Sequence, residues 1–190
     1  MNLSLFIEPV LSLSKERWGG IFNYSAGVLM DIVVCIKQVP HPDYFSKITI
    51  DPVTKRMRRE GIPLVINPAD RNAIELGLQL KEQFSGKVTV ISMGPPVVRQ
   101  ALEEALAMGA DEAILLCDPA FAGADSLATA FTLAIAIKKF CACSLVLCGN
   151  ETTDSGTAQV GPQVAEFLDV PHVTNVRATS FVEDGVIMAE

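Results

Sequence analysis

The stretch of this 190-residue chain best suited to chemistry is Gly-Asn-Glu-Thr-Thr-Asp-Ser-Gly-Thr-Ala-Gln-Val-Gly, at positions 149–161. It joins a predicted strand to a predicted helix. Glycines let a backbone approach a ligand closely, and Thr153, Ser155 and Thr157 offer short hydroxyl donors. The following helix adds unpaired N–H groups and the positive end of its dipole. The stretch is therefore suited to holding a phosphate, although turns of this composition also serve simply as capping loops.

The same stretch lacks the signatures of the common nucleotide-dependent enzymes. It matches neither G-x-x-x-x-G-K-[ST] nor G-x-G-x-x-G. Glu151 and Asp154 have no nucleophile or positioned base beside them in the sequence, so we predict no catalytic residue. We interpret Asp154 as a brace for the loop or a ribose contact. Phosphoryl or adenylyl transfer is a disfavoured alternative, because no metal-carboxylate pair accompanies the turn.

The elements that would position this stretch are short apolar runs alternating with segments of helical period, from Asp31 onward. Near-continuous Val/Ile/Leu runs are typical of parallel strands covered on both faces. The predicted strands are Ile32–Lys37, Lys87–Ser92, Glu112–Cys117, Ser144–Cys148, Val173–Phe181 and Gly185–Met188. The predicted helices are Ala69–Phe84, Val97–Met108, Asp125–Phe140 and Ala158–Leu168. The pattern predicts an α/β fold, a three-layer Rossmann-like sandwich around a mostly parallel sheet.

Ligands of open parallel sheets bind outside the carboxyl ends of the strands. Lys37, Met93-Gly94 and the segment 118–125 occupy such ends, as does the 149–161 stretch. Each also has a plain structural interpretation. Lys37 can be an exposed lysine, Met93 a core residue and Phe121 a buried aromatic. Asn67 before Pro68 is explained by helix capping alone.

Composition narrows the functional classes. A net charge of -7 disfavours nucleic acid as a partner, because an anionic surface repels a polyanion. No stretch has the roughly 18 uncharged apolar residues needed for membrane insertion. The five cysteines stand at irregular spacing in apolar runs, which favours reduced thiols in the cytoplasm. With two histidines, the chain offers no pattern for a metal site.

Two segments stand outside the βαβ rhythm. Residues 1–29 have no signal-peptide pattern, so we predict either a loosely ordered extension or a true translation start at Met30. Residues 30–190 are then one nucleotide-binding domain. Residues 38–66, rich in proline and basic residues with a β-like piece at Lys47–Ile50, are predicted to form a long excursion.

Five segments in a fixed order resemble the electron-transfer flavoprotein β subunit. They are Val-Val-Cys-Ile-Lys-Gln-Val-Pro, Ile-Asn-Pro-Ala-Asp, Val-Ile-Ser-Met-Gly-Pro-Pro, Glu-Ala-Leu-Ala-Met-Gly-Ala-Asp-Glu-Ala and Thr-Ala-Gln-Val-Gly-Pro-Gln. The resemblance implies an adenine-nucleotide-hydrolase-like fold and an α subunit that carries the electron-transferring FAD. It also implies an acyl-CoA or other dehydrogenase as a further partner. The β subunits of this family bind AMP or, in the electron-bifurcating branch, a second FAD reduced by NADH.

The resemblance also assigns the binding residues. Cys35 and Lys37 would flank the nucleotide, Asn67 and Met93 would contact its adenosine side, and residues 154–160 would wrap its phosphates. The full predicted set is Cys35, Lys37, Asn67, Met93, Gly94, Phe121, Gly123, Ala124, Asp125, Gly149, Thr153, Asp154, Ser155, Gly156, Thr157, Ala158, Gln159 and Val160.

The choice between FAD and AMP stays open at this stage. Val-Ile-Ser-Met-Gly-Pro-Pro and Phe121–Asp125 look like the bifurcating branch, whereas Asn150 and residues 152–156 depart from its Arg and Ala-Ile-Asp-Gly-Asp. The family's β subunit continues well beyond Glu190, so we expect a C-terminally truncated β subunit that carries electrons poorly alone. A stand-alone adenine-nucleotide module without a redox role is the alternative.

Overall fold

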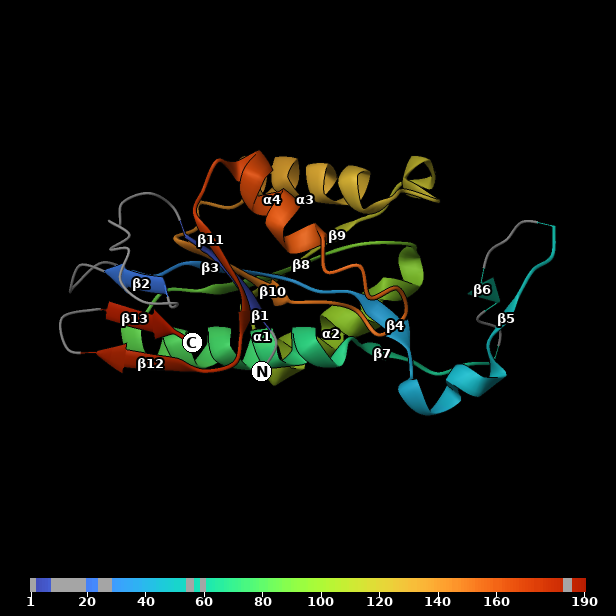
Figure 1. The fold of residues 1–190 in the computed structure, drawn as a ribbon, viewed down its shortest axis with the longest axis horizontal. Coiled ribbons are helices and arrows are strands. Elements are labelled where there is room, and N and C mark those ends of the chain that lie inside the picture. Colours follow the sequence, from blue (N-terminus) through green and yellow to red (C-terminus); the bar gives the residue numbers. More distant parts are fainter. Residues whose placement is uncertain (1–2, 8–19, 24–28, 54–56, 59–60, 183–185) are drawn as a thin grey trace.

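The computed structural model describes residues 3–7, 20–23, 29–53, 57–58, 61–182 and 186–190. At its centre is a six-stranded sheet (Figure 1). In spatial order its strands are β11 (His172–Val176), β1 (Leu3–Ile7), β10 (Leu145–Gly149), β3 (Ile32–Cys35), β8 (Val88–Met93) and β9 (Glu112–Leu116). The four strands from β10 to β9 run parallel, and β1 is antiparallel to both of its neighbours.

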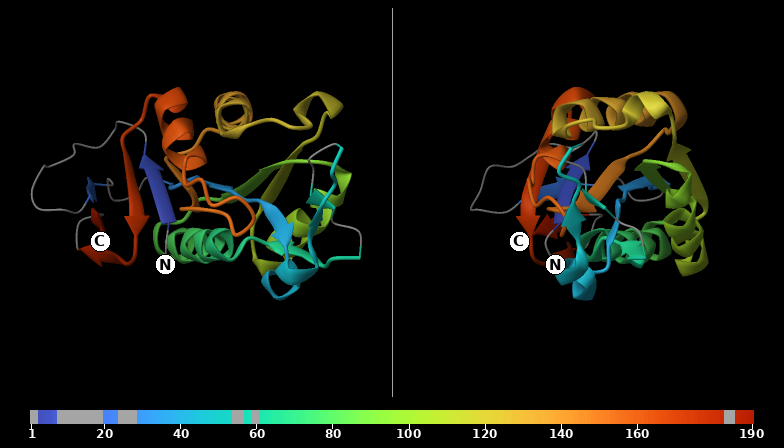
Figure 2. Two further views of the ribbon diagram at one scale, coloured as in Figure 1. Left: turned by 45° about the vertical axis from the view of Figure 1, so that its right-hand side comes forward. Right: turned by 90° about the vertical axis from the view of Figure 1, so that its right-hand side faces the viewer.

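Two helices cover each face of this sheet (Figures 1 and 2). One face carries α1 (Pro68–Phe84) and α2 (Arg99–Met108), and the other carries α3 (Ser126–Phe140) and α4 (Val160–Leu168). The predicted three-layer α/β fold with a mostly parallel sheet is thereby confirmed.

The apolar strand β3 shows why the sequence folds this way. Ile32 and Val34 belong to the core beneath α1 and α2, whereas Val33 and Cys35 belong to the core beneath α3 and α4. All four are buried. Neither face of such a strand contacts water, so apolar and polar residues do not alternate along its sequence.

The order in which the chain visits the strands reverses between β3 and β10. From β3 the chain moves outward through α1 and α2 to β9, and then returns through α3 to β10 on the other side of β3. Right-handed crossovers require the return helix to lie on the opposite face of the sheet. The segments that leave β3 and β10 therefore diverge to opposite faces and open a crevice between the two strand ends.

The main helices and parallel strands begin and end within two residues of their predicted positions. The two-residue shift at the start of α4 has a clear structural cause. This helix begins at Val160 instead of Ala158, because Ala158 has a left-handed backbone with φ 52°. Ala158 and Gln159 therefore stay in the loop.

The predicted strand Val173–Phe181 is divided in the structure. After β11, the backbone N–H groups of Arg177 and Ala178 donate to the Glu190 carbonyl, and the chain leaves the main sheet. It continues as β12 (Thr179–Val182), which pairs with β13 (Val186–Ala189). The prediction was wrong in joining the two strands, since a turn between sheets has no strong apolar signature.

The excursion 38–66 contains short elements of its own. Strand β4 (Gln38–Pro40) pairs with β7 (Leu64–Ile66), and β5 (Thr49–Ile50) pairs with β6 (Met57–Arg58). A 3-10 helix, η1 (Pro42–Lys47), and the β5/β6 pair project away from the main sheet (Figure 1).

The N-terminal segment supplies two strands that the sequence did not predict. Strand β1 lies between β10 and β11, and Leu3 within it is fully buried. Strand β2 (Gly20–Asn23) pairs with β13. Residues 8–19 and 24–28 lie outside the described residues, and the division of the chain at residue 30 stays a prediction.

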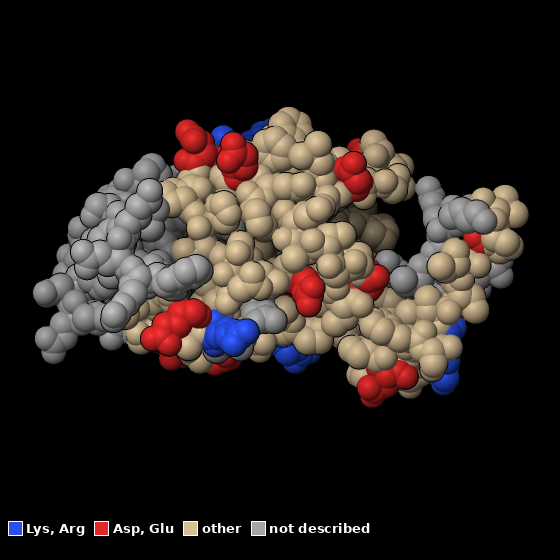
Figure 3. Space-filling view, viewed as in Figure 1, with Lys and Arg blue, Asp and Glu red and all other residues tan. Residues whose placement is uncertain are grey.

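The basic side chains on one face of the molecule are spread out (Figure 3), as expected of a chain with a net charge of -7. On the face seen in Figure 3, the described Lys and Arg side chains lie apart from one another instead of forming one basic patch. Within the described part of the chain, no helix has both the length and the hydrophobicity of a bilayer span.

Candidate functional site

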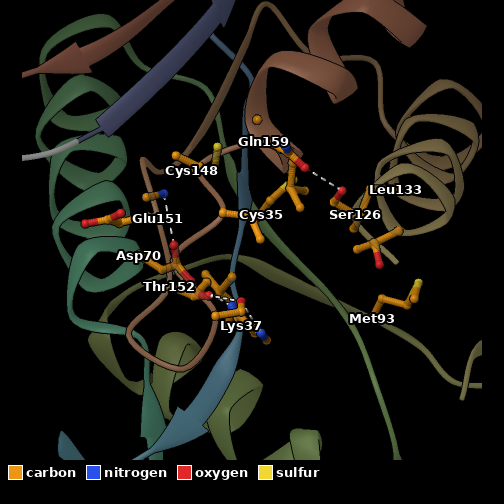
Figure 4. Close-up of a pocket in the computed structure, with 18 of the residues that line it drawn as sticks. Cys35, Lys37, Asp70, Met93, Ser126, Leu133, Cys148, Glu151, Thr152 and Gln159 are labelled. Atoms are coloured by element: carbon orange, nitrogen blue, oxygen red, sulfur yellow. Dashed lines mark hydrogen bonds between the residues drawn. The ribbon is translucent and has the colours of Figure 1, made fainter. Parts of the chain in front are cut away.

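A cavity of about 590 Å³ opens at the carboxyl ends of β3 and β10 (Figure 4). Its floor includes Cys35 and Cys148, which are register partners on the two strands. This is the point where the strand order reverses, the usual ligand position in an open parallel sheet. Its volume lies in the range of small-molecule and cofactor sites.

Most of the predicted site residues line this cavity. They are Cys35, Lys37, Met93, Phe121, Gly123, Ala124, Asp125, Gly149, Ser155, Thr157, Ala158, Gln159 and Val160. The structure thus gathers residues from four separate strand ends around one space. Whether each contacts a nucleotide stays a prediction.

The other predicted residues do not line the cavity but support the segments that do. They are Asn67, Gly94, Thr153, Asp154 and Gly156. Gly94, for example, ties the turn after β8 to β9 through a 3.0 Å hydrogen bond to the Leu116 carbonyl. A side chain there would meet Val98, because a Cβ would lie 2.6 Å from its Cγ2 atom.

Six lining residues were missed by the sequence interpretation. They are Ile36, Asp70, Ser126, Thr129, Leu133 and Cys148. Asn150, Glu151, Thr152 and Gly161 also line the cavity and belong to the predicted 149–161 stretch, although they were not among the individually predicted binding residues. Helical spacing could have found three of the six, since Ser126, Thr129 and Leu133 recur at intervals of three and four on one face of α3. Asp70 gives no such signal, because it looks like an ordinary first-turn acid of α1.

One end of the cavity is polar. Lys37 Nζ lies 2.7 Å from Asp154 Oδ1 and 3.4 Å from Ser155 Oγ. The Thr152 and Ser155 hydroxyls are 2.8 Å apart, and the Gly156 N–H donates to the Thr152 carbonyl over the same distance. The Lys37 ammonium therefore lies beside a loop that carries several hydroxyls, and together they form a suitable surface for an anionic group.

The first turn of α1 holds this loop in place. The Asn67 side chain donates to the Glu151 carbonyl over 3.0 Å and accepts from the Thr153 N–H over 3.2 Å. Asn67 is the N-cap residue of α1, yet its side chain makes no capping hydrogen bond. Capping therefore does not explain this asparagine, whose amide binds a loop 84 residues further along the chain.

Asp70 joins the two strand ends beneath the same loop. One carboxylate oxygen accepts the Lys37 N–H at 2.8 Å, and the other accepts the Gly149 N–H at 2.9 Å. Position 149 must be glycine for this approach, because a Cβ would lie 2.3 Å from the Asp70 Oδ1 atom. Burial raises the pKa of Asp70 to about 7, and hydrogen bonds from the Lys37 N–H, the Asn67 side chain and the Gly149 N–H offset part of that effect.

The cysteines of the floor are chemically quiet. Burial raises the pKa of the Cys35 thiol well above its usual value, and that of Cys148 also rises strongly. Both side chains are therefore neutral near pH 7 and contribute an apolar, polarisable surface instead of a nucleophile.

The other end of the cavity carries the apolar side chains of Met93 and Leu133, with the polar side chain of Ser126 beside Leu133. Met93 and Leu133 lie across the cavity from Lys37 (Figure 4). The approach to α3 is shaped by local bonds, with Asp118 accepting from Ala120 and Asp125 capping the helix through the Ala128 N–H. A 3.0 Å hydrogen bond between Ser126 Oγ and Gln159 Oε1 links the α3 and α4 sides.

The arrangement can hold an amphipathic ligand. A flat apolar group fits between the Met93 and Leu133 side and the sulfur-bearing floor, while an attached anion faces Lys37 and the 150–157 loop. Among the described residues, no cluster of His, Cys, Asp and Glu has the arrangement of a metal site.

Comparison with known proteins identifies the family. The family model described as electron transfer flavoprotein domain matches residues 54–190. The chain is 55% identical over 159 residues to an electron transfer flavoprotein subunit beta of Thermoanaerobacterium thermosaccharolyticum, covering 84% of this chain and 60% of the relative.

Two further relatives carry more specific names. Caffeyl-CoA reductase-Etf complex subunit CarD of Acetobacterium woodii is 51% identical, covering 77% of this chain and 55% of the relative. Protein FixA of Sinorhizobium fredii is 46% identical, covering 81% and 54%. The chain thus spans between half and two thirds of the length of these relatives. By its domain match and its close similarity to β subunits and FixA proteins, this chain belongs to the electron transfer flavoprotein family.

Proposed function

We propose that this chain acts as an electron transfer flavoprotein β subunit that binds FAD or AMP in the cavity between the ends of β3 and β10. The observation that carries the proposal is the cavity itself. It stands at the reversal of strand order and has an apolar end and a lysine- and hydroxyl-rich end. An adenine nucleotide has the same two-part chemistry.

In this proposal the nucleotide has one orientation. Its adenosine lies toward Met93, and its phosphate faces Lys37, Ser155 and Thr157. The Lys37 ammonium supplies charge at the polar end, and the hydroxyls of the loop donate to phosphate oxygens. The Cys35 and Cys148 thiols form a neutral floor that does not bind the phosphate, so Lys37 and the 150–157 loop supply the groups that do.

The redox role rests on the family. When FAD is bound, the cofactor supplies the electron and hydride chemistry, while the protein positions it and sets its surroundings. We propose that an α subunit is the partner and that the pair accepts electrons from NADH or a dehydrogenase in the cytoplasm. The relative named as a subunit of a caffeyl-CoA reductase-Etf complex supports an assembly with a reductase. We propose FAD over AMP because the Val-Ile-Ser-Met-Gly-Pro-Pro segment and Phe121–Asp125 resemble the bifurcating branch.

The test is to purify this chain together with an electron transfer flavoprotein α subunit and to count the nucleotides released on denaturation. Two FAD per pair would support the bifurcating assignment, and one FAD with one AMP would support simple electron shuttling. A chain that binds ATP, ignores flavin and never associates with the α subunit would contradict the redox role and favour a stand-alone nucleotide-binding module.

A further inference from the structure

The turn Asn67-Pro68-Ala69-Asp70 at the start of α1, here called the α1 turn, holds backbone groups from both sides of the cavity. From the β3 side it binds the N–H and the carbonyl of Lys37. From the β10 side it binds the Gly149 N–H, the Glu151 carbonyl and the Thr153 N–H. Two side chains and one backbone N–H thus fix both segments that form the polar end.

Asn67 has no surface left for a ligand. It is 0% exposed and does not line the cavity. Its amide nitrogen is engaged by Glu151 and its amide oxygen by Thr153. A buried amide that makes both kinds of hydrogen bond to one loop selects a single position for that loop, because any other position leaves a buried polar group unpaired.

Asp70 complements this arrangement on the strand side. It is 4% exposed, and its two oxygens reach neighbouring strand ends. A carboxylate accepts on both oxygens, whereas an isosteric amide would present an NH₂ group to one of the two N–H donors. Asp70 therefore fixes the distance between Lys37 and Gly149, the residues from which the polar end is built.

We propose that the α1 turn is the positioning element for phosphate recognition. Asn67 acts on the ligand through the 150–157 loop, and Asp70 acts by holding the Lys37 and Gly149 backbone. This inference rests on the proposed nucleotide function. It differs from the assignment that family resemblance gives Asn67, which is a contact to adenosine.

The two assignments predict different ligand dependence. If Asn67 positions the loop, its loss weakens binding of a phosphorylated ligand and spares the bare nucleoside. If Asn67 touched adenosine, both ligands would weaken together. A purely structural role would lower thermal stability and leave the ratio of the two affinities unchanged.

The experiment is calorimetric titration of the full chain with AMP and with adenosine, at a temperature well below the melting transition of every variant. For Asn67→Ala we expect about a tenfold loss of AMP affinity, the effect of one to two buried hydrogen bonds. Adenosine affinity should change less than about twofold. Gln79→Ala is the matched control, because Gln79 is an exposed amide on the same helix that bonds only along α1, to Glu75.

Asp70→Asn gives the second variant and decides the question if Asn67→Ala does not fold. It should show the same selective loss of AMP affinity. Equal losses for AMP and adenosine, or no change in either, would overturn the positioning role while leaving the nucleotide site intact. Failure of the unmodified chain to bind AMP at all would instead overturn the proposed function and this inference with it.

Discussion

The two ends of the cavity are built in different ways. At the anchored end, residues 149–157 are tied to α1 and to Lys37, just after β3, by hydrogen bonds that span from 79 to 118 positions of sequence. At the self-closed end, residues 118–125 are shaped by hydrogen bonds between near neighbours, such as Asp118 with Ala120.

This contrast suits the chemistry that the proposed nucleotide function assigns to each end. Hydrogen bonds to a phosphate are directional, so their donors must be held in place before the ligand arrives. Burial of an apolar ring is non-directional and tolerates a wall that adjusts locally. The proposed nucleotide site therefore needs ties between distant residues chiefly at its polar end, and the loop of that end is held by hydrogen bonds of long sequence separation.

The largest expected effect concerns Asp70 at the anchored end. Its pKa is raised from 3.8 to about 7 in the folded chain, so the folded state holds a proton that the unfolded state releases between these values. The free energy of unfolding should therefore fall as pH rises from about 4 to about 7, by up to ~4 kcal/mol. Urea unfolding at several pH values measures this slope.

Asp70→Asn is the control for that experiment, because it removes the titrating group and keeps the shape. Its unfolding free energy should vary less with pH than that of the unmodified chain. Identical pH profiles for the two proteins would show that Asp70 is not the buried acid that the structure indicates.

Gly149→Ala should give the next largest effect. The added Cβ would lie 2.3 Å from Asp70 Oδ1 and 2.8 Å from Ala69 Cβ, so the strand end must move away from α1. We expect a loss of about 3 kcal/mol in unfolding free energy. Gly156→Ala is the comparison, since a Cβ there meets nothing closer than 3.8 Å and only the φ of 57° opposes it, at about 1 kcal/mol.

Lys37→Met should weaken AMP binding by about 10- to 100-fold, because a charge-assisted hydrogen bond to phosphate is lost. It also removes the ion pair between Lys37 and Asp154, whose side chain is 4% exposed. Titration with AMP measures the first effect and thermal melting the second. Lys87→Met, which removes an exposed ion pair with Glu112 at the sheet's far edge, should leave AMP affinity unchanged.

The smallest effect is expected where the two ends meet. Ser126→Ala removes the exposed hydrogen bond to Gln159, worth about 0.5 kcal/mol, and should change AMP affinity by less than about threefold. A loss as large as that of Lys37→Met would show that the self-closed end is also fixed by a long-range tie, and the contrast between the ends would fail.

The sequence predicted the features that depend on local pattern. Strands and helices could be predicted because apolar runs and helical spacing indicate which residues are buried. The loop could be predicted from its Gly, Ser and Thr residues between a strand and a helix. The gathering of four loop segments around one cavity followed from the geometry of parallel sheets, in which the carboxyl ends of the strands lie at one edge.

What the sequence did not predict depends on contacts between distant residues. The Asn67–Glu151 hydrogen bond joins positions 84 apart, and no sequence pattern near either residue predicts it. The same holds for Asp70 beneath Gly149 and for strand β1, whose partners β10 and β11 lie more than 130 residues away. The left-handed Ala158 was missed because that conformation is unusual for alanine, which normally favours helix.

We propose that the cavity between β3 and β10 holds an adenine nucleotide by its phosphate. A crystal structure of the full chain grown with AMP tests it most directly. We predict the phosphate beside Lys37 and the 150–157 loop, with the adenosine toward Met93. AMP bound at another place, or a cavity closed by the chain's own side chains, would contradict the account.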